Sequence, residues 1–277
     1  MNEQALKDRL HAIAKEKSIH FNECWKNLLL ERFLARLARS SQMDKFIFKG
    51  GFLLAYMLEI GRETTDLDFL LSNMNASEEQ IKQAVQDIIS GQMNDGFVFT
   101  YETIELLEQP HMDYPGYRVT LRVEFGRMRG KIQIDVGIGD VVKPSNRDFC
   151  LFQYRGKPMF ENAISLSVYP PETIFAEKLE TVISKGASNS RMKDYHDLLL
   201  LSRHQDLLDK KNLQNSIEST FKNRGTILSA IEFDETDLRS LQKLWTAHLK
   251  NLGDIAQELK IPKEIQAVIN EINMSTL

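Results

Sequence analysis

Two aspartates separated by a single residue are the first part of the sequence whose spacing indicates chemistry. Asp66 and Asp68 lie in the segment Asp66-Leu67-Asp68-Phe69. If this segment is a strand, its side chains alternate between two faces, so the carboxylates share one face and the apolar residues the other. Paired carboxylates repel each other unless a cation lies between them, and Mg²⁺ prefers oxygen ligands. The pair therefore predicts a divalent-cation site, with a solvated polar face as the alternative.

A pair of glycines precedes these aspartates in the segment Lys49-Gly50-Gly51. The apolar residues at 46–48 predict a strand before the glycines, and residues 52–60 predict a buried helix after them, with Gly61 as its cap. Backbone N–H groups at the start of a helix are free to bind phosphate. This order of elements would place a triphosphate beside the metal site, and an ordinary tight turn is the alternative.

A third carboxylate is expected from residues 131–138, where apolar residues at 132, 134, 136 and 138 share one face of a predicted strand. Asp135 lies on the other face. If this strand neighbours the first, Asp66, Asp68 and Asp135 could hold two Mg²⁺ ions of the kind used in phosphoryl or nucleotidyl transfer. Asp140 is an alternative ligand, and a solvated Asp135 is the alternative to a metal site.

These motifs together resemble those of a known family, the AbiEii-type nucleotidyltransferase-like toxins of the DNA polymerase beta-like nucleotidyltransferase superfamily. The matching residues in this part of the chain are Lys49-Gly50-Gly51, Arg62, Thr65, Asp66-Leu67-Asp68-Phe69 and Asp135. The family's later helical motifs match Ala176-Glu177-Lys178-Leu179 and Lys193-Asp194-Tyr195-His196-Asp197-Leu198. The resemblance covers residues 45–205 in the family's order, and the combined signature is specific although each motif alone is not.

The resemblance implies a Mg²⁺-dependent enzyme that transfers a nucleoside monophosphate from an NTP to an acceptor such as tRNA. The three carboxylates would bind the metal ions. The residues expected to bind the nucleotide are Lys49, Gly50, Gly51, Arg62, Thr65 and Lys178. The helical motif would add Asp194 to the catalytic cleft, with Asp197 as the second choice.

The helical motifs and Arg62 can also be interpreted without the family. Lys178 lies toward the edge of the apolar arc of the helix predicted at 172–184, where a lysine must extend to solvent or meet an anion. Asp194 and Asp197 are three residues apart and share a helical face, which could simply be solvated. Arg62 could neutralise phosphate or pair with the glutamates at 59 and 63.

A local group of basic residues is expected in the central strands. Arg118 and Arg122 share the polar face of the strand predicted at 117–125. They could balance the carboxylates or approach a tRNA backbone, and pairing with Glu124 is the alternative. The net charge of −4, from 35 Lys and Arg against 39 Asp and Glu, excludes binding of nucleic acid through bulk charge.

The elements that must position these residues fall into three parts. Residues 1–42 predict amphipathic helices. Residues 45–168 predict mixed helix and strand, including a helix at 77–89 with a Ser77–Gln80 capping box. Residues after Pro170-Pro171 predict helices. We therefore expect an α/β (α+β) fold, in which N-terminal helices precede a small mixed-sheet core and a helical domain follows it, with domains at 1–168 and 169–277. The resemblance implies that this core is of the nucleotidyltransferase type.

The remaining composition limits location and function. Two cysteines exclude a disulfide framework and a multi-cysteine zinc site. There is no signal peptide or apolar run long enough to span a membrane, so a cytoplasmic protein without a membrane partner is expected. The resemblance implies a toxin of a toxin–antitoxin or abortive-infection system, with a separately encoded antitoxin. A kinase-like phosphotransfer enzyme and a non-enzymatic nucleotide- or partner-binding module are the alternatives.

Overall fold

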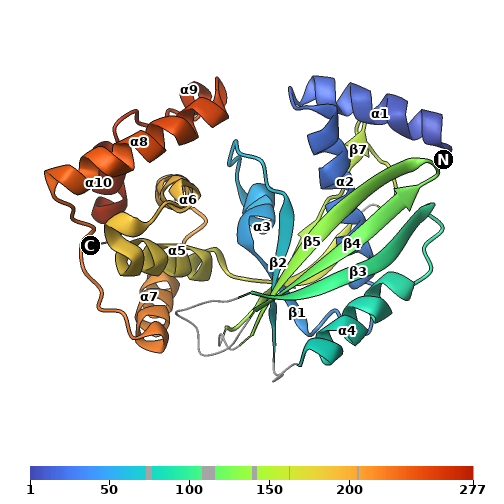
Figure 1. Cartoon of the computed structure of the whole chain (residues 1–277), viewed down its shortest axis with the longest axis horizontal. Helices are drawn as coiled ribbons and strands as arrows, with labels where there is room; N and C mark the ends of the chain where they lie inside the picture. The colour runs from blue at the N-terminus through green and yellow to red at the C-terminus, as the bar shows by residue number, and fades with distance from the viewer. Residues whose placement is uncertain (73–76, 108–115, 139–141, 162, 205, 277) are drawn as a thin grey trace. The chain divides into compact units, whose positions relative to one another are not determined.

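The computed structural model describes residues 1–72, 77–107, 116–138, 142–161, 163–204 and 206–276 (Figure 1). The chain forms two compact units. Unit 1 comprises Met1–Met57 and Glu63–Tyr169, and unit 2 comprises Leu58–Arg62 and Pro170–Leu277. A short segment from the first half of the sequence therefore packs with the C-terminal helices, which the sequence patterns do not predict.

Unit 1 is built on a mixed sheet. Within the described residues the sheet has seven strands in the order β3-β4-β5-β2-β1-β9-β6. The strands are β1 (Phe46–Lys49), β2 (Asp66–Leu71), β3 (Phe97–Leu107), β4 (Gly116–Phe125), β5 (Met128–Ile138), β6 (Ser145–Phe149) and β9 (Ile164–Val168). β2 runs parallel to β5, and β1 runs parallel to β9, whereas the other neighbours are antiparallel. The predicted α/β (α+β) fold with a mixed sheet is confirmed.

The helices of unit 1 pack on strands of this sheet or on one another. They are α1 (Glu3–Glu16), α2 (Phe21–Leu37), α3 (Gly50–Met57) and α4 (Glu78–Ser90), while β7 (Gln153–Tyr154) and β8 (Lys157–Pro158) form a separate hairpin. α2 lies against β5 so closely that a Cβ on Gly130 would be 2.4 Å from Leu29 Cδ1. Phe33 of α2 packs on Phe69 of β2, with ring centroids 6.2 Å apart. The sheet's polar residues therefore lie on the opposite face.

α2 is buried around more of its circumference than an amphipathic helix would be. Arg32 is 0% exposed and Arg36 is 4% exposed. Arg36 donates to both carboxylate oxygens of Asp95 at 2.9 Å, and Arg32 pairs with Glu161. The residues that neutralise these arginines are distant in sequence, so hydrophobic periodicity alone does not identify them.

Two local predictions around the helices have different outcomes. The capping box of α4 is confirmed, because the Ser77 side chain accepts from Gln80 N and the Gln80 side chain accepts from Ser77 N. The predicted end of α3 is wrong, because α3 stops at Met57 and the following residues join unit 2. Gly61 does not cap this helix. Its φ is +62°, and a Cβ there would lie 2.3 Å from Ile255 Cγ2, so close packing requires the glycine.

Unit 2 is helical from Pro171 onward. Its elements are α5 (Pro171–Lys185), a 3₁₀ turn (Gly186–Ser188), α6 (Met192–Arg203), α7 (Lys210–Arg224), α8 (Glu235–Leu252), α9 (Ile255–Glu258) and α10 (Ile265–Thr276). α5 packs against α6 and α7, and α10 packs against α6 and α8. Trp245 of α8 is fully buried and donates from Nε1 to Pro262 O at 2.9 Å. The predicted helical second half is thus observed.

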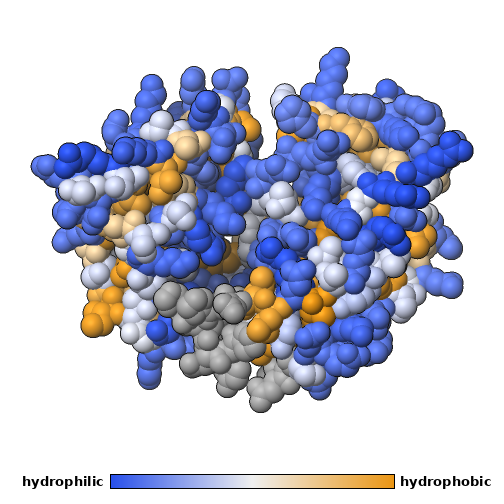
Figure 2. Space-filling view, in the orientation of Figure 1, coloured by the Kyte–Doolittle hydropathy of each residue, from blue (hydrophilic) through white to orange (hydrophobic). Residues whose placement is uncertain are grey.

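The outer surfaces of both units are mainly hydrophilic in the view of Figure 2. Exposed apolar side chains occur at scattered positions, among them Val98, Leu106 and Ile227. In the part of the chain that the structure describes, every helix is too short or too polar to cross a bilayer.

Candidate active site

A row of charged residues crosses four neighbouring strands on the polar face of the unit 1 sheet. Lys49 of β1 is the register partner of Asp68 of β2. Asp68 is in turn opposite Asp135 of β5, and Asp135 is opposite Arg118 of β4. The two carboxylates therefore lie side by side, with a cationic residue on each outer strand.

Asp66 completes the predicted group of carboxylates, because it lies two residues before Asp68 and shares its face. Arg118 Nε and Nη2 donate to the two oxygens of Asp135, both at 2.7 Å. Arg118 Nη2 is also 4.0 Å from Asp66 Oδ2. The hydrogen bond from Arg118 to Asp135, together with the charges of the three aspartates, raises the pKa of Arg118 despite its partial burial.

Gly50 allows the Asp68 carboxylate to lie against the start of α3. Gly50 has a φ of +78°, and a Cβ built on it would be 1.8 Å from Asp68 Oδ2. Only glycine fits both this backbone conformation and this contact. The glycine pair is therefore more than a turn, because it brings the backbone at the N-terminus of α3 beside the carboxylates.

The other nucleotide-binding residues predicted in unit 1 lie near this row. Lys49 Nζ is 3.4 Å from Tyr169 Oη and 4.5 Å from the centre of the Tyr169 ring. Gly51 follows Gly50 in the first turn of α3, and Thr65 is exposed immediately before β2. No motif in the sequence indicated Tyr169, because its role depends on the pairing of β1 with β9. Asp140 lies outside the described residues.

The chemistry of these side chains fits a hard divalent cation. The ligands are carboxylate oxygens on one face, and the side chains of Asp66 and Asp135 are 29% and 19% exposed, so solvent reaches them. Among the described residues, no three His, Cys, Asp or Glu side chains already converge as a metal-binding group. Asp135 instead pairs with a guanidinium, which shows that this position attracts positive charge.

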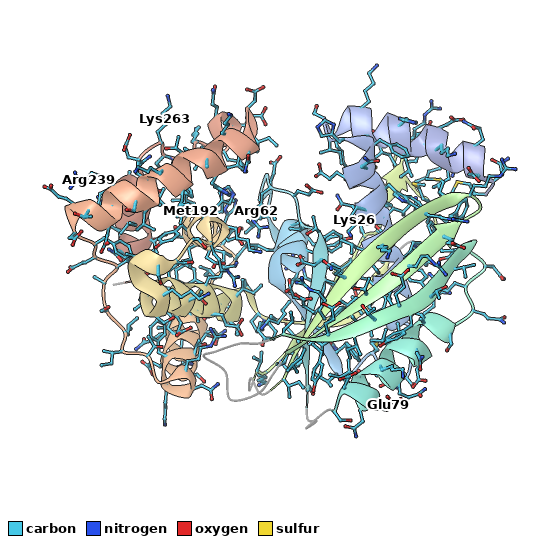
Figure 3. All side chains as sticks on the ribbon, viewed as in Figure 1. Lys26, Arg62, Glu79, Met192, Arg239 and Lys263 are labelled. Carbon is cyan, nitrogen blue, oxygen red and sulfur yellow. The ribbon has the colours of Figure 1, made fainter. Side chains whose placement is uncertain are left out.

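The predicted helical residues form a buried ion network in unit 2. Lys178 Nζ is 3.0 Å from Asp194 Oδ1 and 2.8 Å from Asp197 Oδ2. Arg62 donates to both oxygens of Asp197, at 2.8 and 2.6 Å, and Arg191 pairs with Asp194 at 2.8 Å. The Asp194 and Asp197 side chains are 1% and 0% exposed. Figure 3 labels Arg62, which enters this unit through the segment Leu58–Arg62.

The charges in this network control each other's ionisation. Burial alone would raise the pKa of Asp197, but the charge of Lys178 and the hydrogen bonds and charge of Arg62 hold that pKa well below its usual range. Burial acts to lower the pKa of Lys178, whereas Asp197 and Asp194 raise it above its ordinary value. Lys178 and Asp197 are therefore both charged at neutral pH.

Two histidines beside this network were not predicted. His196 is completely buried, and its Nε2 donates to Ile60 O at 2.7 Å. Its ring meets that of His248 with centroids 5.1 Å apart. His196 lies on α6, which is buried along almost its whole length. Its contact with Ile60 depends on the segment that leaves unit 1.

The basic residues of the central strands are largely paired with glutamates. Arg122 Nε is 4.0 Å from Glu102 and 3.9 Å from Glu124, and Lys131 Nζ is 2.6 Å from Glu102. Arg129 Nε is 3.3 Å from Glu124. The pairing with Glu124 that was the alternative to a tRNA contact is therefore present. Lys26 of α2, labelled in Figure 3, donates to Lys131 O at 2.6 Å.

A family model of the nucleotidyl transferase AbiEii toxin of type IV toxin–antitoxin systems matches residues 32–270. The chain belongs to the AbiEii family. This match includes all the predicted site residues in both units and confirms the family inferred from the motifs. A type IV toxin–antitoxin system implies a separately encoded antitoxin as the partner of an AbiEii toxin.

Two solved structures from Helicobacter pylori are similar to this AbiEii-family chain. One, a candidate nucleotidyltransferase, has a TM-score of 0.42 and 14% sequence identity, with 90% of this chain and 92% of that chain covered. The other, JHP933, has a TM-score of 0.43 and 13% identity, with 89% of this chain and 88% of that chain covered. No curated protein sequence matches the chain.

Proposed function

We propose that this AbiEii-family chain is a Mg²⁺-dependent nucleotidyltransferase that transfers a nucleoside monophosphate from an NTP to a hydroxyl of tRNA. The observation that best supports this proposal is the row on the unit 1 sheet. Asp66, Asp68 and Asp135 share one face, and Gly50 brings the N-terminus of α3 against Asp68. Carboxylates beside the backbone N–H groups of a helix N-terminus suit a substrate that brings both divalent cations and phosphate.

The reaction forms one bond and breaks one bond. The acceptor oxygen attacks the α-phosphorus of the NTP, the bond between the α- and β-phosphates breaks, and pyrophosphate leaves with its electron pair. The acceptor's proton passes to a nearby base. Mg²⁺ held by Asp66, Asp68 and Asp135 would supply charge neutralisation and a more acidic acceptor hydroxyl. The backbone at Gly50 and Gly51, with Lys49 and Thr65 beside it, would orient the phosphates.

The unit 2 residues enter this proposal through their match to the family motifs. Lys178 would bind nucleotide phosphate, with Arg62 in the same role and Asp194 and Asp197 as catalytic residues. In the structure these four side chains pair with one another. Their substitution would therefore change stability as well as activity, and the two effects must be measured separately.

The biological role follows from the family. We propose that the chain acts as the toxin of a toxin–antitoxin system used in abortive infection, and that an adjacent gene encodes its antitoxin. A tRNA acceptor would place the reaction in the cytoplasm. Expression of the wild type without antitoxin should slow growth, and Asp68→Asn should restore it. Equal growth of the two strains would contradict toxicity without contradicting the transferase activity.

The transferase activity is tested with purified protein, Mg²⁺, total tRNA and each NTP labelled at the α- or the γ-phosphate. The α-label should enter tRNA and the γ-label should not. Asp66→Asn and Asp68→Asn should each abolish transfer, because either change removes a charged ligand while keeping the side-chain shape. Asp148→Asn, on an exposed position of β6 in the same sheet, is the matched control and should remain active.

Each alternative function has its own result in this assay. Transfer of the γ-label would show a kinase-like phosphotransfer enzyme. Binding of Mg²⁺–NTP without transfer to any acceptor would favour a non-enzymatic module. Full transfer by both Asp66→Asn and Asp68→Asn would overturn the assignment of the site.

A further inference from the structure

Arg118 occupies the position beside Asp135 and Asp66 that a metal ion bound by both carboxylates would take. Its guanidinium donates to both oxygens of Asp135 at 2.7 Å, and Nη2 is 4.0 Å from Asp66 Oδ2. The Arg118 side chain is 31% exposed, so it has room to move away from the sheet. This contact follows from register, because Arg118 and Asp135 are directly opposite on β4 and β5.

A guanidinium and a metal ion would compete for the same carboxylate. A bidentate arginine pair uses the lone pairs on both oxygens and is among the stronger ion pairs in proteins. The same oxygens would have to turn to a divalent cation for Asp135 to act as a ligand. Two positive charges also cannot share this position without strong repulsion. Occupation by Arg118 and occupation by a metal ion are therefore alternatives.

We propose that Arg118 is a positioning residue that acts as an internal counter-cation for the metal site. It holds Asp135 and screens Asp66 when no divalent cation is bound, and it releases Asp135 when one binds. Arg118 thereby sets the concentration of divalent cation that the site requires. This inference rests on the proposed function, because it assumes that Asp66, Asp68 and Asp135 bind a metal ion.

Arg122 shows that this arrangement is specific to Arg118. The two arginines lie on the same strand and the same face, four residues apart. Arg122 is 47% exposed, and its Nε approaches Glu102 and Glu124 only to 4.0 and 3.9 Å. It therefore serves as a matched control, since Arg122→Gln removes a similar charge from the same face without changing the partner of Asp135.

The test measures binding of Mn²⁺ alone, without nucleotide, by calorimetry and by the shift of the thermal unfolding midpoint. Arg118→Gln should lower the unfolding midpoint in metal-free buffer, because the carboxylates lose their counter-charge. It should also bind Mn²⁺ about tenfold more tightly than the wild type, the factor that corresponds to about 1.4 kcal/mol. Arg122→Gln should bind Mn²⁺ as the wild type does.

Three results would overturn the inference. Unchanged Mn²⁺ affinity in Arg118→Gln would show no competition, and weaker affinity would show that Arg118 supports Asp135 as a ligand. If Arg118→Gln does not fold, Arg118→Lys serves as the test variant, because lysine keeps the charge but lacks the bidentate fork of arginine. Arg118→Lys should bind Mn²⁺ more tightly than the wild type. Unchanged Mn²⁺ affinity in this variant would overturn the inference.

The same titration separates this inference from the proposed function. Wild-type binding of Mn²⁺ that is lost in Asp66→Asn, together with unchanged affinity in Arg118→Gln, would refute only the role of Arg118. Failure of every variant to bind Mn²⁺, Arg118→Gln included, would refute the metal site itself and this inference with it.

Discussion

Substitution of Gly50 by alanine tests whether the glycine pair positions a catalytic carboxylate. At Gly50 the added Cβ would lie 1.8 Å from Asp68 Oδ2, whereas real Cβ contacts essentially never fall below 3.0 Å. The carboxylate must therefore move, and the backbone must keep a φ of +78° that alanine disfavours. Both costs fall on unit 1.

Gly156→Ala is the matched control, because it shares the cost of a positive φ but not the cost of a close contact with the added Cβ. Gly156 has a φ of +71° in the turn between β7 and β8, and a Cβ there would meet nothing within 4 Å. The left-handed conformation costs a non-glycine residue about 1–2 kcal/mol, and overpacking costs about 1–3 kcal/mol more. We therefore expect Gly156→Ala to lose about 1–2 kcal/mol of unfolding free energy and Gly50→Ala to lose about 2–5 kcal/mol.

The assay can observe each unit separately, because the chain's two tryptophans are divided between them. Trp25 lies in unit 1 and Trp245 in unit 2. Urea unfolding followed by ¹⁹F NMR of 5-fluorotryptophan should show the loss at Trp25 alone. Gly50→Ala should also lose Mn²⁺ binding, and Gly156→Ala should keep it. Equal loss of stability in the two variants, with Mn²⁺ binding intact in both, would refute the argument that Gly50 makes room for Asp68.

Two further predictions concern unit 2, with Trp245 as the reporter. Lys178→Met should lower the unfolding free energy of unit 2 by about 3 kcal/mol, because it leaves the buried Asp194 and Asp197 with fewer cations. Lys193→Met, on the exposed side of α6, is the control and should change this free energy little. Equal stability of the two variants would contradict the ion network. Burial lowers the pKa of His248 from 6.5 to about 4, so the unfolded chain binds a proton that the folded unit does not. The unfolding free energy of unit 2 should therefore fall as the pH falls from about 6.5 toward 4, by up to about 1.4 kcal/mol per pH unit. His248→Phe should reduce this dependence on pH. An unchanged dependence would contradict the burial of a neutral His248 ring.

The faces of the site strands could be predicted from the sequence, but their neighbours could not. Alternation with a period of two assigns Asp66, Asp68 and Asp135 to the polar faces of their strands, and a register slip would expose the apolar residues instead. The sequence does not state that β2 and β5 are adjacent, because that pairing joins segments far apart in the chain. The pairing of Arg118 with Asp135 depends on the same long-range register.

Buried charges were the least predictable part of the molecule. Arg32 and Arg36 occupy helix positions that periodicity assigns to solvent, yet Asp95 and Glu161 neutralise them in the interior. His196 on α6 is also fully buried, in contact with Ile60 and His248. A buried ion requires partners that satisfy it. Those partners come from other elements, so only the assembled fold identifies them.

The spacing within the first motif can now be explained physically. Lys49 and Asp68 are opposite each other on adjacent strands, so the intervening residues form an excursion that must leave β1 and return to β2. Its first part is α3, whose start contacts Asp68 through Gly50. Its second part joins unit 2, where Arg62 pairs with Asp197. One segment thus supplies the glycine on which the Asp68 position depends and the arginine on which the Asp197 charge depends. A deletion within 58–62 would shorten both connections, and it should therefore weaken both sites even though it removes none of the site aspartates.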